Sequence, residues 1–229
     1  MTDPKVEKND FEPLLATLEL AGAEVLDLGC GVGSLARRIA KESGALSVTA
    51  IDVDSTQIER AIKKGGDVNY LTATAKALPL AAASLDAIVM MKSLHHVPIS
   101  EMDAAFGEMA RVLRSGGQVY ICEPAYKGAF NDILRLFHDE GTVRAAAIDA
   151  IKRAEAGPFE IVQTSEYLLK PTFQNLDDFR GKVMNVPWLE NKITPEIEKQ
   201  VAAAWQDRAD PDGCATLSSP MLVFVLRKL

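Results

Sequence analysis

Aromatic and basic residues are both in short supply in this chain. Phe, Trp and Tyr make up only 6% of its 229 residues, so a surface on which nucleic-acid bases stack is not expected. Asp and Glu outnumber Lys and Arg by 32 to 25, which gives a formal net charge of −7. Because a duplex-binding protein needs a basic face to displace counterions, we expect no nucleic-acid partner.

Cysteines and long apolar segments are scarce as well. Cys30, Cys122 and Cys214 are odd in number and far apart, which predicts neither a disulfide framework nor a zinc site, and we expect no metal. The first nine residues lack the basic-then-apolar layout of a signal peptide. No apolar run approaches the roughly 20 residues that span a bilayer. We therefore expect a cytoplasmic protein without membrane insertion; the sequence does not indicate an oligomeric state.

The first two-thirds of the chain alternates between two patterns. Short apolar runs predict strands, and the segments between them carry apolar residues at helical spacing. The last of these helices is predicted to end at residues 115–117, Ser-Gly-Gly, a good C-terminal signal. Strands separated by single helices are typical of a parallel sheet, whose ligands lie beyond the carboxyl ends of the strands. The predicted strands are residues 24–28, 46–51, 68–72, 85–91 and 118–122.

The first strand runs into a loop with glycines at positions 29, 31 and 33. Such glycines let a backbone approach a ligand closely and open a helix whose N–H groups face it. The alternative is a tight turn that binds nothing. Residues 31–36 also fit the dinucleotide pattern G-x-G-x-x-A, and Asp52 follows about 20 residues later. An NAD-dependent oxidoreductase therefore remains an alternative at this point.

Two carboxylates stand beside this loop. Asp52 ends a strand, where a carboxylate can accept both hydroxyls of a ribose. Its alternative role is a helix cap, for which Asp54 or Ser55 is better placed. Asp27 ends a strand predicted to be buried, and a buried carboxylate needs a partner. That partner is either a loop amide or the ammonium group of a ligand.

Six motifs follow one another in a characteristic order between residues 25 and 124. Together they resemble the class I S-adenosylmethionine-dependent methyltransferases, particularly the small-molecule branch that includes the ubiquinone and menaquinone biosynthesis enzymes. Each motif is loose, whereas their order and spacing are specific. The motifs are VLDLGCGVG (25–33), AIDVD (50–54), ALPL (77–80), SLDAIV (84–89), LHHV (94–97) and EMARVLRSGG (108–117).

The resemblance implies an α/β fold: a doubly wound, mostly parallel, seven-stranded Rossmann-like sheet with an antiparallel last strand and a helical cover. It implies a single domain of residues 1–229, with a cofactor-binding core at 11–124 and the last helix and strands at 125–229. It also implies S-adenosylmethionine as cofactor, S-adenosylhomocysteine as product, and a small-molecule methyl acceptor. A non-catalytic protein that binds the same cofactor is a further alternative.

Each matching position acquires an expected role from the family. Thr74-Ala75 stands where relatives usually carry Asp-Ala, so a charge-assisted contact with the adenine amino group is lost. Lys92 belongs to a segment expected to line the methionine side of the cofactor. The remaining expected contacts are Gly29, Gly31 and Gly33 for methionine, Asp27 for its amino group, Asp52 for ribose and Val53 for adenine.

The acceptor site is expected beyond the fourth and fifth strands. His96 is the candidate general base, although relatives with different substrates share the His95-His96 pair, so at least one of the two is structural. Glu123 and Tyr126 are expected to face the acceptor, the alternatives being a strand-end contact and helix packing. Residues 176–205 are long for a plain connection and are interpreted as a lid, or alternatively as a helix packed at the sheet edge. Its candidate lining residues are Phe179, Val183, Met184 and Trp188.

Overall fold

The computed structural model describes residues 4–186, 189 and 192–229, so Trp188 lies outside the described residues. The chain folds into two compact units. The larger contains residues 9–123, 143–165 and 222–229, and the smaller contains the residues before 9 together with 124–142 and 166–221. Compact units are not by themselves separate domains, and the expected single domain with its core at 11–124 stays a prediction. Among the described residues, no helix has both the length and the apolar character to cross a membrane.

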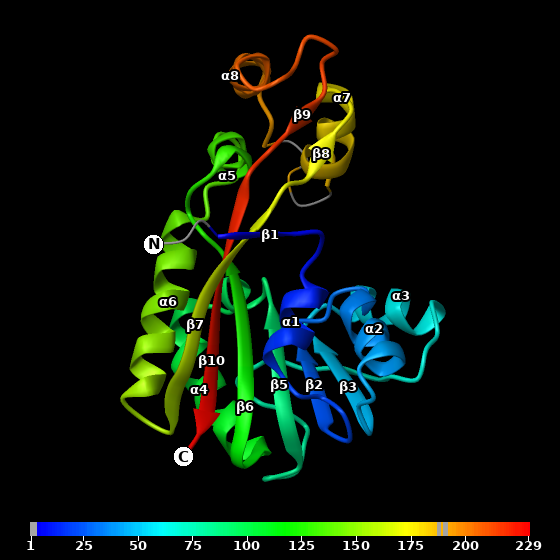
Figure 1. The fold of residues 1–229 in the computed structure, drawn as a ribbon, viewed down its shortest axis with the longest axis vertical. Coiled ribbons are helices and arrows are strands. Elements are labelled where there is room, and N and C mark those ends of the chain that lie inside the picture. Colours follow the sequence, from blue (N-terminus) through cyan, green and yellow to red (C-terminus); the bar gives the residue numbers. More distant parts are fainter. Residues whose placement is uncertain (1–3, 187–188, 190–191) are drawn as a thin grey trace. The chain divides into compact units, whose positions relative to one another are not determined.

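The larger unit is built on a twisted sheet with the strand order β7-β10-β6-β5-β2-β3-β4 (Figure 1). Neighbouring strands from β6 to β4 pair in parallel, whereas β10 runs in the opposite direction (Figure 1). This confirms the mostly parallel sheet with an antiparallel last strand. The strands are β2 (Glu24–Leu28), β3 (Ser47–Asp52), β4 (Asn69–Thr72), β5 (Leu85–Met91), β6 (Leu113–Pro124), β7 (Phe159–Leu169) and β10 (Ser219–Lys228).

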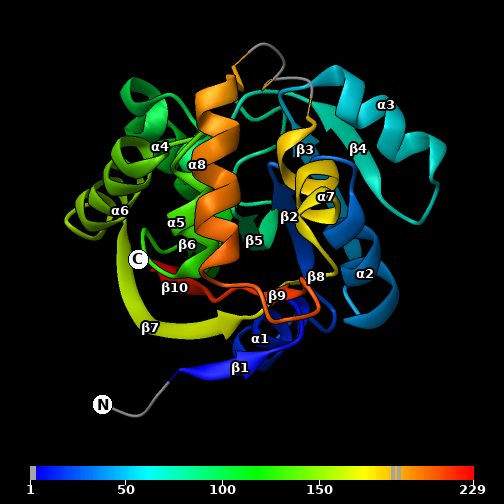
Figure 2. The same ribbon diagram turned by 90° about the horizontal axis from the view of Figure 1, so that it is seen from above.

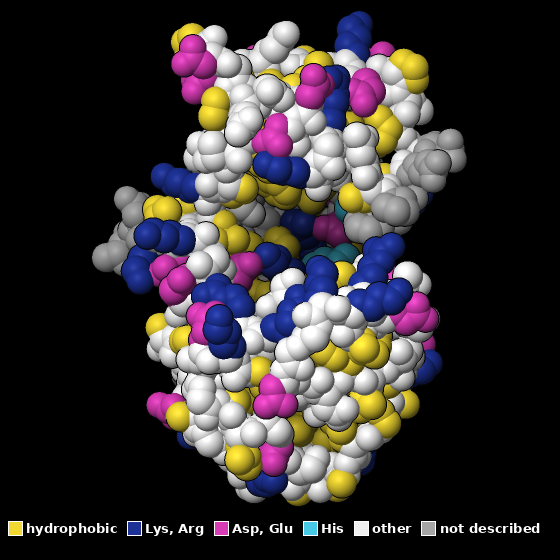
Figure 3. Space-filling view, turned by 90° about the vertical axis from the view of Figure 1, so that its right-hand side faces the viewer, with side chains coloured by type: hydrophobic (Ala, Val, Ile, Leu, Met, Phe, Trp, Pro, Cys, Tyr) yellow, Lys and Arg dark blue, Asp and Glu magenta, His cyan; other side chains and the backbone are white. Residues whose placement is uncertain are grey.

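Helices cover both faces of this sheet (Figure 2). On one face lie α1 (Phe11–Thr17), α2 (Ser34–Glu42) and α3 (Ser55–Lys63). On the other lie α4 (Met102–Val112) and α6 (Gly141–Glu155), whose apolar sides belong to the main hydrophobic core. The central strands are apolar on both faces because each face is covered, as in other parallel sheets. The face drawn in Figure 3 carries both acidic and basic side chains.

The smaller unit has a core of its own. Phe179 is fully buried there, with its ring 5.1 Å from that of Phe173 and 5.5 Å from that of Trp205. Met184 is buried in the same cluster, and Val183 packs against it. Phe179 and Met184, expected to line an acceptor site, are thus buried core residues of this unit. Its elements are α5 (Ala129–Leu134), β8 (Thr172–Phe173), α7 (Leu176–Phe179), the π-helical turn η3 (Arg180–Met184), α8 (Pro195–Gln206) and β9 (Ala215–Thr216).

Several element boundaries differ from the sequence prediction. The fourth helix ends at Val112, because Leu113 already pairs with Leu85 as the start of β6. Beyond β6, the chain forms two helices, the second of which starts at Gly141, and residues 159–169 form one continuous strand. An unexpected strand, β1 (Lys5–Glu7), pairs with the end of β7 in the smaller unit, so eight strands take part instead of seven.

Candidate functional site

The glycine loop connects β2 to α2 in a backbone shape that favours glycine. Gly29, Gly31 and Gly33 have φ of 83°, 53° and 68°, in the left-handed region that strains other residues. The amides of Gly29 and Cys30 donate to the carbonyl oxygen of Ile51, at 2.8 and 3.0 Å. The loop is therefore fastened to the carboxyl end of β3, the next strand of the sheet.

The three glycines serve different purposes. A Cβ atom on Gly29 would lie 2.5 Å from the Cβ of Ser93, and one on Gly33 would lie 2.6 Å from the ring of Tyr70. Neighbouring protein atoms therefore fill the space beside both Gly29 and Gly33. A Cβ atom on Gly31 would meet no described atom within 4 Å. Gly31 therefore borders open space, as the approach of a ligand to this backbone requires.

Asp52 joins this loop to the turn after β3. One carboxylate oxygen accepts the amide of Gly31 at 2.7 Å, and the other accepts the amide of Asp54 at 2.9 Å. Asp54 in turn caps α3 by accepting the amide of Thr56 at 2.8 Å. The cap thus falls to Asp54, as the sequence favoured, and Asp52 holds the loop in place.

Asp27 lies in the middle of the sheet and is only 1% exposed. Its neighbours across the sheet are Ala50 on β3 and Val89 on β5. Its carboxylate accepts the backbone amide of Ala36 in the first turn of α2, yet its Oδ2 atom has no hydrogen-bond partner among the described residues. Burial, with a smaller contribution from the charge of Asp52, raises the pKa of Asp27 to about 7.

Cys30 is the one thiol in the loop. Burial, reinforced by the charges of Asp27 and Asp52, raises the pKa of Cys30 to about 12. The thiol therefore stays protonated at neutral pH and is no nucleophile.

The segment after β5 is tied to three neighbours. Lys92 has φ of 56°, a strained conformation for a residue with a side chain, and its amide donates to the carbonyl of Cys122 at 2.7 Å. Its ammonium group lies 2.6 Å from the carboxylate of Asp10, just before α1. The Ser93 hydroxyl donates to the carbonyl of Leu28 at 2.8 Å, which links this segment to the end of β2.

The two histidines that follow have different environments. They lie on a short 3-10 turn, η1 (Leu94–His96). His95 is 4% exposed and its Nδ1 contacts the carboxylate of Glu123, which also accepts the amide of Leu94 at 3.0 Å. Glu123 is itself 1% exposed and makes the strand-end contact that was the alternative to facing an acceptor. His96 is exposed, with its ring centre 4.0 Å from that of His95.

Tyr126 belongs to the smaller unit. Its hydroxyl donates to the carboxylate of Asp139 at 2.9 Å, and this contact raises the pKa of Tyr126. Its side chain is otherwise exposed.

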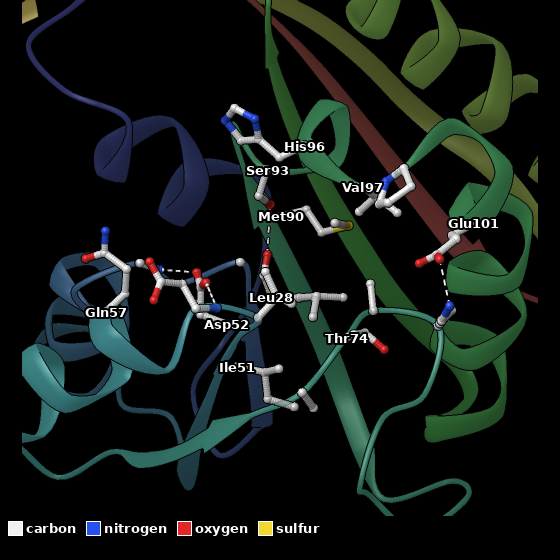
Figure 4. Close-up of a pocket in the computed structure, with 18 of the residues that line it drawn as sticks. Leu28, Ile51, Asp52, Gln57, Thr74, Met90, Ser93, His96, Val97 and Glu101 are labelled. Atoms are coloured by element: carbon white, nitrogen blue, oxygen red, sulfur yellow. Dashed lines mark hydrogen bonds and ion pairs between the residues drawn. The ribbon is translucent and has the colours of Figure 1, made fainter. Parts of the chain in front are cut away.

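These segments enclose a pocket of about 690 Å³ within the larger unit (Figure 4). Asp27 and Gly33 lie outside its wall: the first is buried in the sheet, and the second packs against Tyr70. The predicted site residues that line it are Gly29, Gly31, Asp52, Val53, Thr74, Ala75, Lys92 and His96.

The wall also contains residues that the sequence analysis missed. Lys76 and Glu101 form an ion pair at 2.6 Å, and Gln57 of α3 lies near Asp52 (Figure 4). Glu101 ends a 3-10 turn, η2 (Ile99–Glu101), which has no periodic apolar pattern that could reveal it. No sequence signal places this turn against the loop after β4.

A family model described as "Methyltransferase domain" matches residues 25–117. The ubiquinone/menaquinone biosynthesis C-methyltransferase UbiE of Allorhizobium ampelinum is 30% identical over 173 residues, which cover 71% of this chain and 63% of that protein. These matches support a class I S-adenosylmethionine-dependent methyltransferase, as the sequence motifs implied.

Other relatives of this chain differ in the reactions that their names give. Methyltransferase GfsG of Streptomyces halstedii is 36% identical over 57% of this chain and 49% of its own length. The O-methyltransferase resE of Aspergillus sclerotiorum is 38% identical over 45% of this chain and 40% of its own length. The chain thus spans less than two thirds of the length of each of these relatives.

Solved structures support the fold. A putative methyltransferase from Bacillus halodurans matches with a TM-score of 0.67 and 19% identity, over 96% of this chain and 98% of that one. The YcgJ protein of Bacillus subtilis matches with a TM-score of 0.64 and 18% identity, over 95% and 97% of the two chains. At such low identity these likenesses establish the Rossmann-like architecture alone.

Similarity to this family implies the use of S-adenosylmethionine, and the site has the chemistry to hold it. Gly31 leaves open space where a ligand can approach the backbone. Asp27 retains a buried carboxylate oxygen without a described partner, which suits an ammonium group directly or through water. Asp52 presents a carboxylate at the pocket wall, which suits two ribose hydroxyls.

Proposed function

We propose that this protein transfers a methyl group from S-adenosylmethionine to a small-molecule acceptor, and that the pocket of the larger unit holds the cofactor. The observation that carries the proposal is the convergence of residues from separate segments. Eight residues selected by sequence motif line one pocket of about 690 Å³. This volume falls within the range of about 300–1,000 Å³ that is typical of small-molecule sites.

In this proposal the cofactor extends along the carboxyl ends of the strands. The carboxylate of Asp52 accepts the ribose hydroxyls, since each of its oxygens can accept a bond besides the one from the protein backbone. Val53, which is 70% exposed, offers an apolar surface to the adenine ring. Thr74 and Ala75 border the adenine, and the methionine portion lies against Gly29, Gly31 and Lys92.

Asp27 orients the amino group of the cofactor. Because the pKa of Asp27 is about 7, its carboxylate is close to half-ionised at neutral pH. A cation beside the carboxylate favours the ionised form. Binding of the cofactor should therefore lower the pKa of Asp27 and release a proton.

The transfer itself needs alignment more than acid–base chemistry. When bound, S-adenosylmethionine supplies a sulfonium whose methyl carbon is already electrophilic. The protein must hold the acceptor in line with this carbon and keep water away. Relatives of this chain are named as C- and O-methyltransferases, and both kinds of acceptor lose a proton overall. We assign that proton to His96, whose exposed imidazole lies on the pocket wall.

A thermal-shift and turnover experiment tests the proposal. S-adenosylmethionine and S-adenosylhomocysteine should raise the melting temperature, NADH should not, and S-adenosylhomocysteine should form with a panel of phenolic and quinol acceptors. The same mixture with the Asp52→Ala variant is the control. Stabilisation by NADH alone would favour an oxidoreductase, and stabilisation without turnover on any acceptor would favour a non-catalytic binder; the comparisons support neither alternative.

A further inference from the structure

The ion pair between Lys76 and Glu101 lies at one end of the pocket and is not explained by folding. The Lys76 ammonium is 2.6 Å from the Glu101 carboxylate, and both residues line the pocket. Their side chains are 45% and 28% exposed, and ion pairs with this much solvent contact contribute little to stability. The pair therefore calls for an explanation in terms of what the pocket binds.

The pair lies at the far side of the pocket from the proposed ribose position. Figure 4 shows Asp52 on one side and Thr74 and Glu101 on the other, with the dashed line at Glu101 marking the ion pair. A nucleoside whose ribose hydroxyls bind Asp52 and whose base extends away from them brings the edge of that base toward Thr74 and Glu101. Val97, beside Glu101, adds an apolar contact to this end.

The pair also has a hydrogen-bonding pattern that is complementary to one particular base edge. A carboxylate only accepts hydrogen bonds and an ammonium group only donates them, so Lys76 and Glu101 present a donor and an acceptor side by side. Adenine carries an exocyclic amino donor next to a ring-nitrogen acceptor on its Watson–Crick edge, which is the complementary arrangement. The hydroxyl of Thr74 can donate or accept, so it cannot by itself select between an amino group and a carbonyl.

We propose that Glu101, positioned by Lys76, selects adenine at the nucleoside end of the pocket. The carboxylate of Glu101 accepts the exocyclic amino group, and the ammonium of Lys76 donates to the adjacent ring nitrogen. This assignment rests on the proposed function, because it requires an adenine nucleoside in this pocket. It also supplies a carboxylate for the amino group that Thr74 lacks.

The test compares two ligands that differ only at the Watson–Crick edge of the base. S-adenosylhomocysteine carries the amino group beside a ring-nitrogen acceptor, whereas S-inosylhomocysteine carries a carbonyl that would face the Glu101 carboxylate and a ring N–H that would face the Lys76 ammonium. By isothermal titration, the wild type should bind the adenosyl ligand at least about tenfold more tightly, since a carbonyl opposite a carboxylate leaves both without a hydrogen. Glu101→Gln should reduce this preference at least about threefold, because an amide accepts from an amino group and donates to a carbonyl, while the ring N–H of the inosyl ligand still faces Lys76.

Two further variants complete the experiment. Glu160→Gln is the matched control, since Glu160 is another half-exposed glutamate in an ion pair, 2.7 Å from Arg227, and does not line the pocket. It should keep the wild-type preference. Lys76→Met should weaken binding of the adenosyl ligand and keep a preference for it, because the acceptor remains.

The outcomes separate the two levels of the proposal. A wild type that binds neither ligand contradicts the proposed function itself. A wild type that binds the adenosyl ligand, with the same preference in Glu101→Gln, overturns the role of Glu101 and leaves the proposed function intact. Equal loss of preference in Glu160→Gln would also overturn it, since the effect would then not be local to the pocket.

Discussion

Replacing Asp52 with alanine would remove a carboxylate that serves two purposes at once. In the structure it accepts the amides of Gly31 and Asp54, at 2.7 and 2.9 Å. In the proposed complex it also accepts the ribose hydroxyls. Asp52→Ala should therefore lower both the stability of the protein and its affinity for S-adenosylhomocysteine.

The two losses can be estimated separately. A hydrogen bond to a charged group contributes about 1.5–3 kcal/mol, and water can replace part of each at this half-buried position. We expect the free energy of unfolding to fall by about 2–3 kcal/mol in total. Losing the acceptor for the ribose should cost a further ~1.5–3 kcal/mol of binding, which is roughly a 10- to 150-fold rise in Kd. Asp52→Asn should lose less, because its amide keeps one acceptor oxygen.

Asp54→Ala is the matched control for this substitution. Asp54 also lines the pocket, but its side chain caps α3 through the amide of Thr56. Its loss should cost about 0.5–2 kcal/mol of stability and leave the Kd within about threefold of the wild type. Urea unfolding and isothermal titration measure the two quantities. If Asp52→Ala destabilises the protein but keeps wild-type affinity, Asp52 only braces the loop and our placement of the ribose is wrong.

Three other substitutions test individual parts of the site. Gly31→Ala should weaken S-adenosylhomocysteine binding more than tenfold and lower the free energy of unfolding by about 1–2 kcal/mol. Gly22 has similar open space and φ of 73°, so Gly22→Ala should lower stability by about the same amount without changing affinity. Equal affinities in the two variants would place the ligand elsewhere. Thr74→Asp should tighten binding by no more than about threefold in a titration, because Glu101 already supplies a carboxylate; tenfold tightening would assign the amino group to position 74. Asp27→Asn should change the pH dependence of stability measured without ligand. The folded-state pKa of Asp27, about 7, lies above its ordinary value of 3.8, so wild-type stability should fall as pH rises toward and through 7. Relative to the variant, the fall should be about 3 kcal/mol between pH 5 and pH 9; parallel profiles would show that burial does not raise this pKa.

The sequence predicted the parts of the molecule whose causes are local. Each central strand is apolar because both of its faces are covered, and the apolar runs therefore located β2, β3 and β5 closely. The glycine loop was equally predictable, because positive φ at three alternating positions requires glycine. The carboxylate at the end of β3 followed from the same pattern, although its bond to Gly31 did not.

Contacts between distant segments were not predictable in this way. Glu123 and His95 are paired because two neighbouring strands end side by side, and only the register of β5 with β6 reveals it. Lys76 and Glu101 meet through a 3-10 turn without a recognisable sequence pattern. The same limit applies to the smaller unit, because apolar residues such as Phe179 look the same in sequence whether they line a ligand or pack in a core.

A crystal structure of the complex with S-adenosylhomocysteine tests the central proposal most directly. We expect electron density for the ligand in the pocket of the larger unit, with both ribose hydroxyls within hydrogen-bond distance of the Asp52 carboxylate. The adenine edge should face Lys76 and Glu101, and the amino group of the homocysteine portion should lie near Asp27. Density for the ligand at another site, or an empty pocket in crystals grown with millimolar ligand, would contradict the assignment of this pocket to the methyl donor.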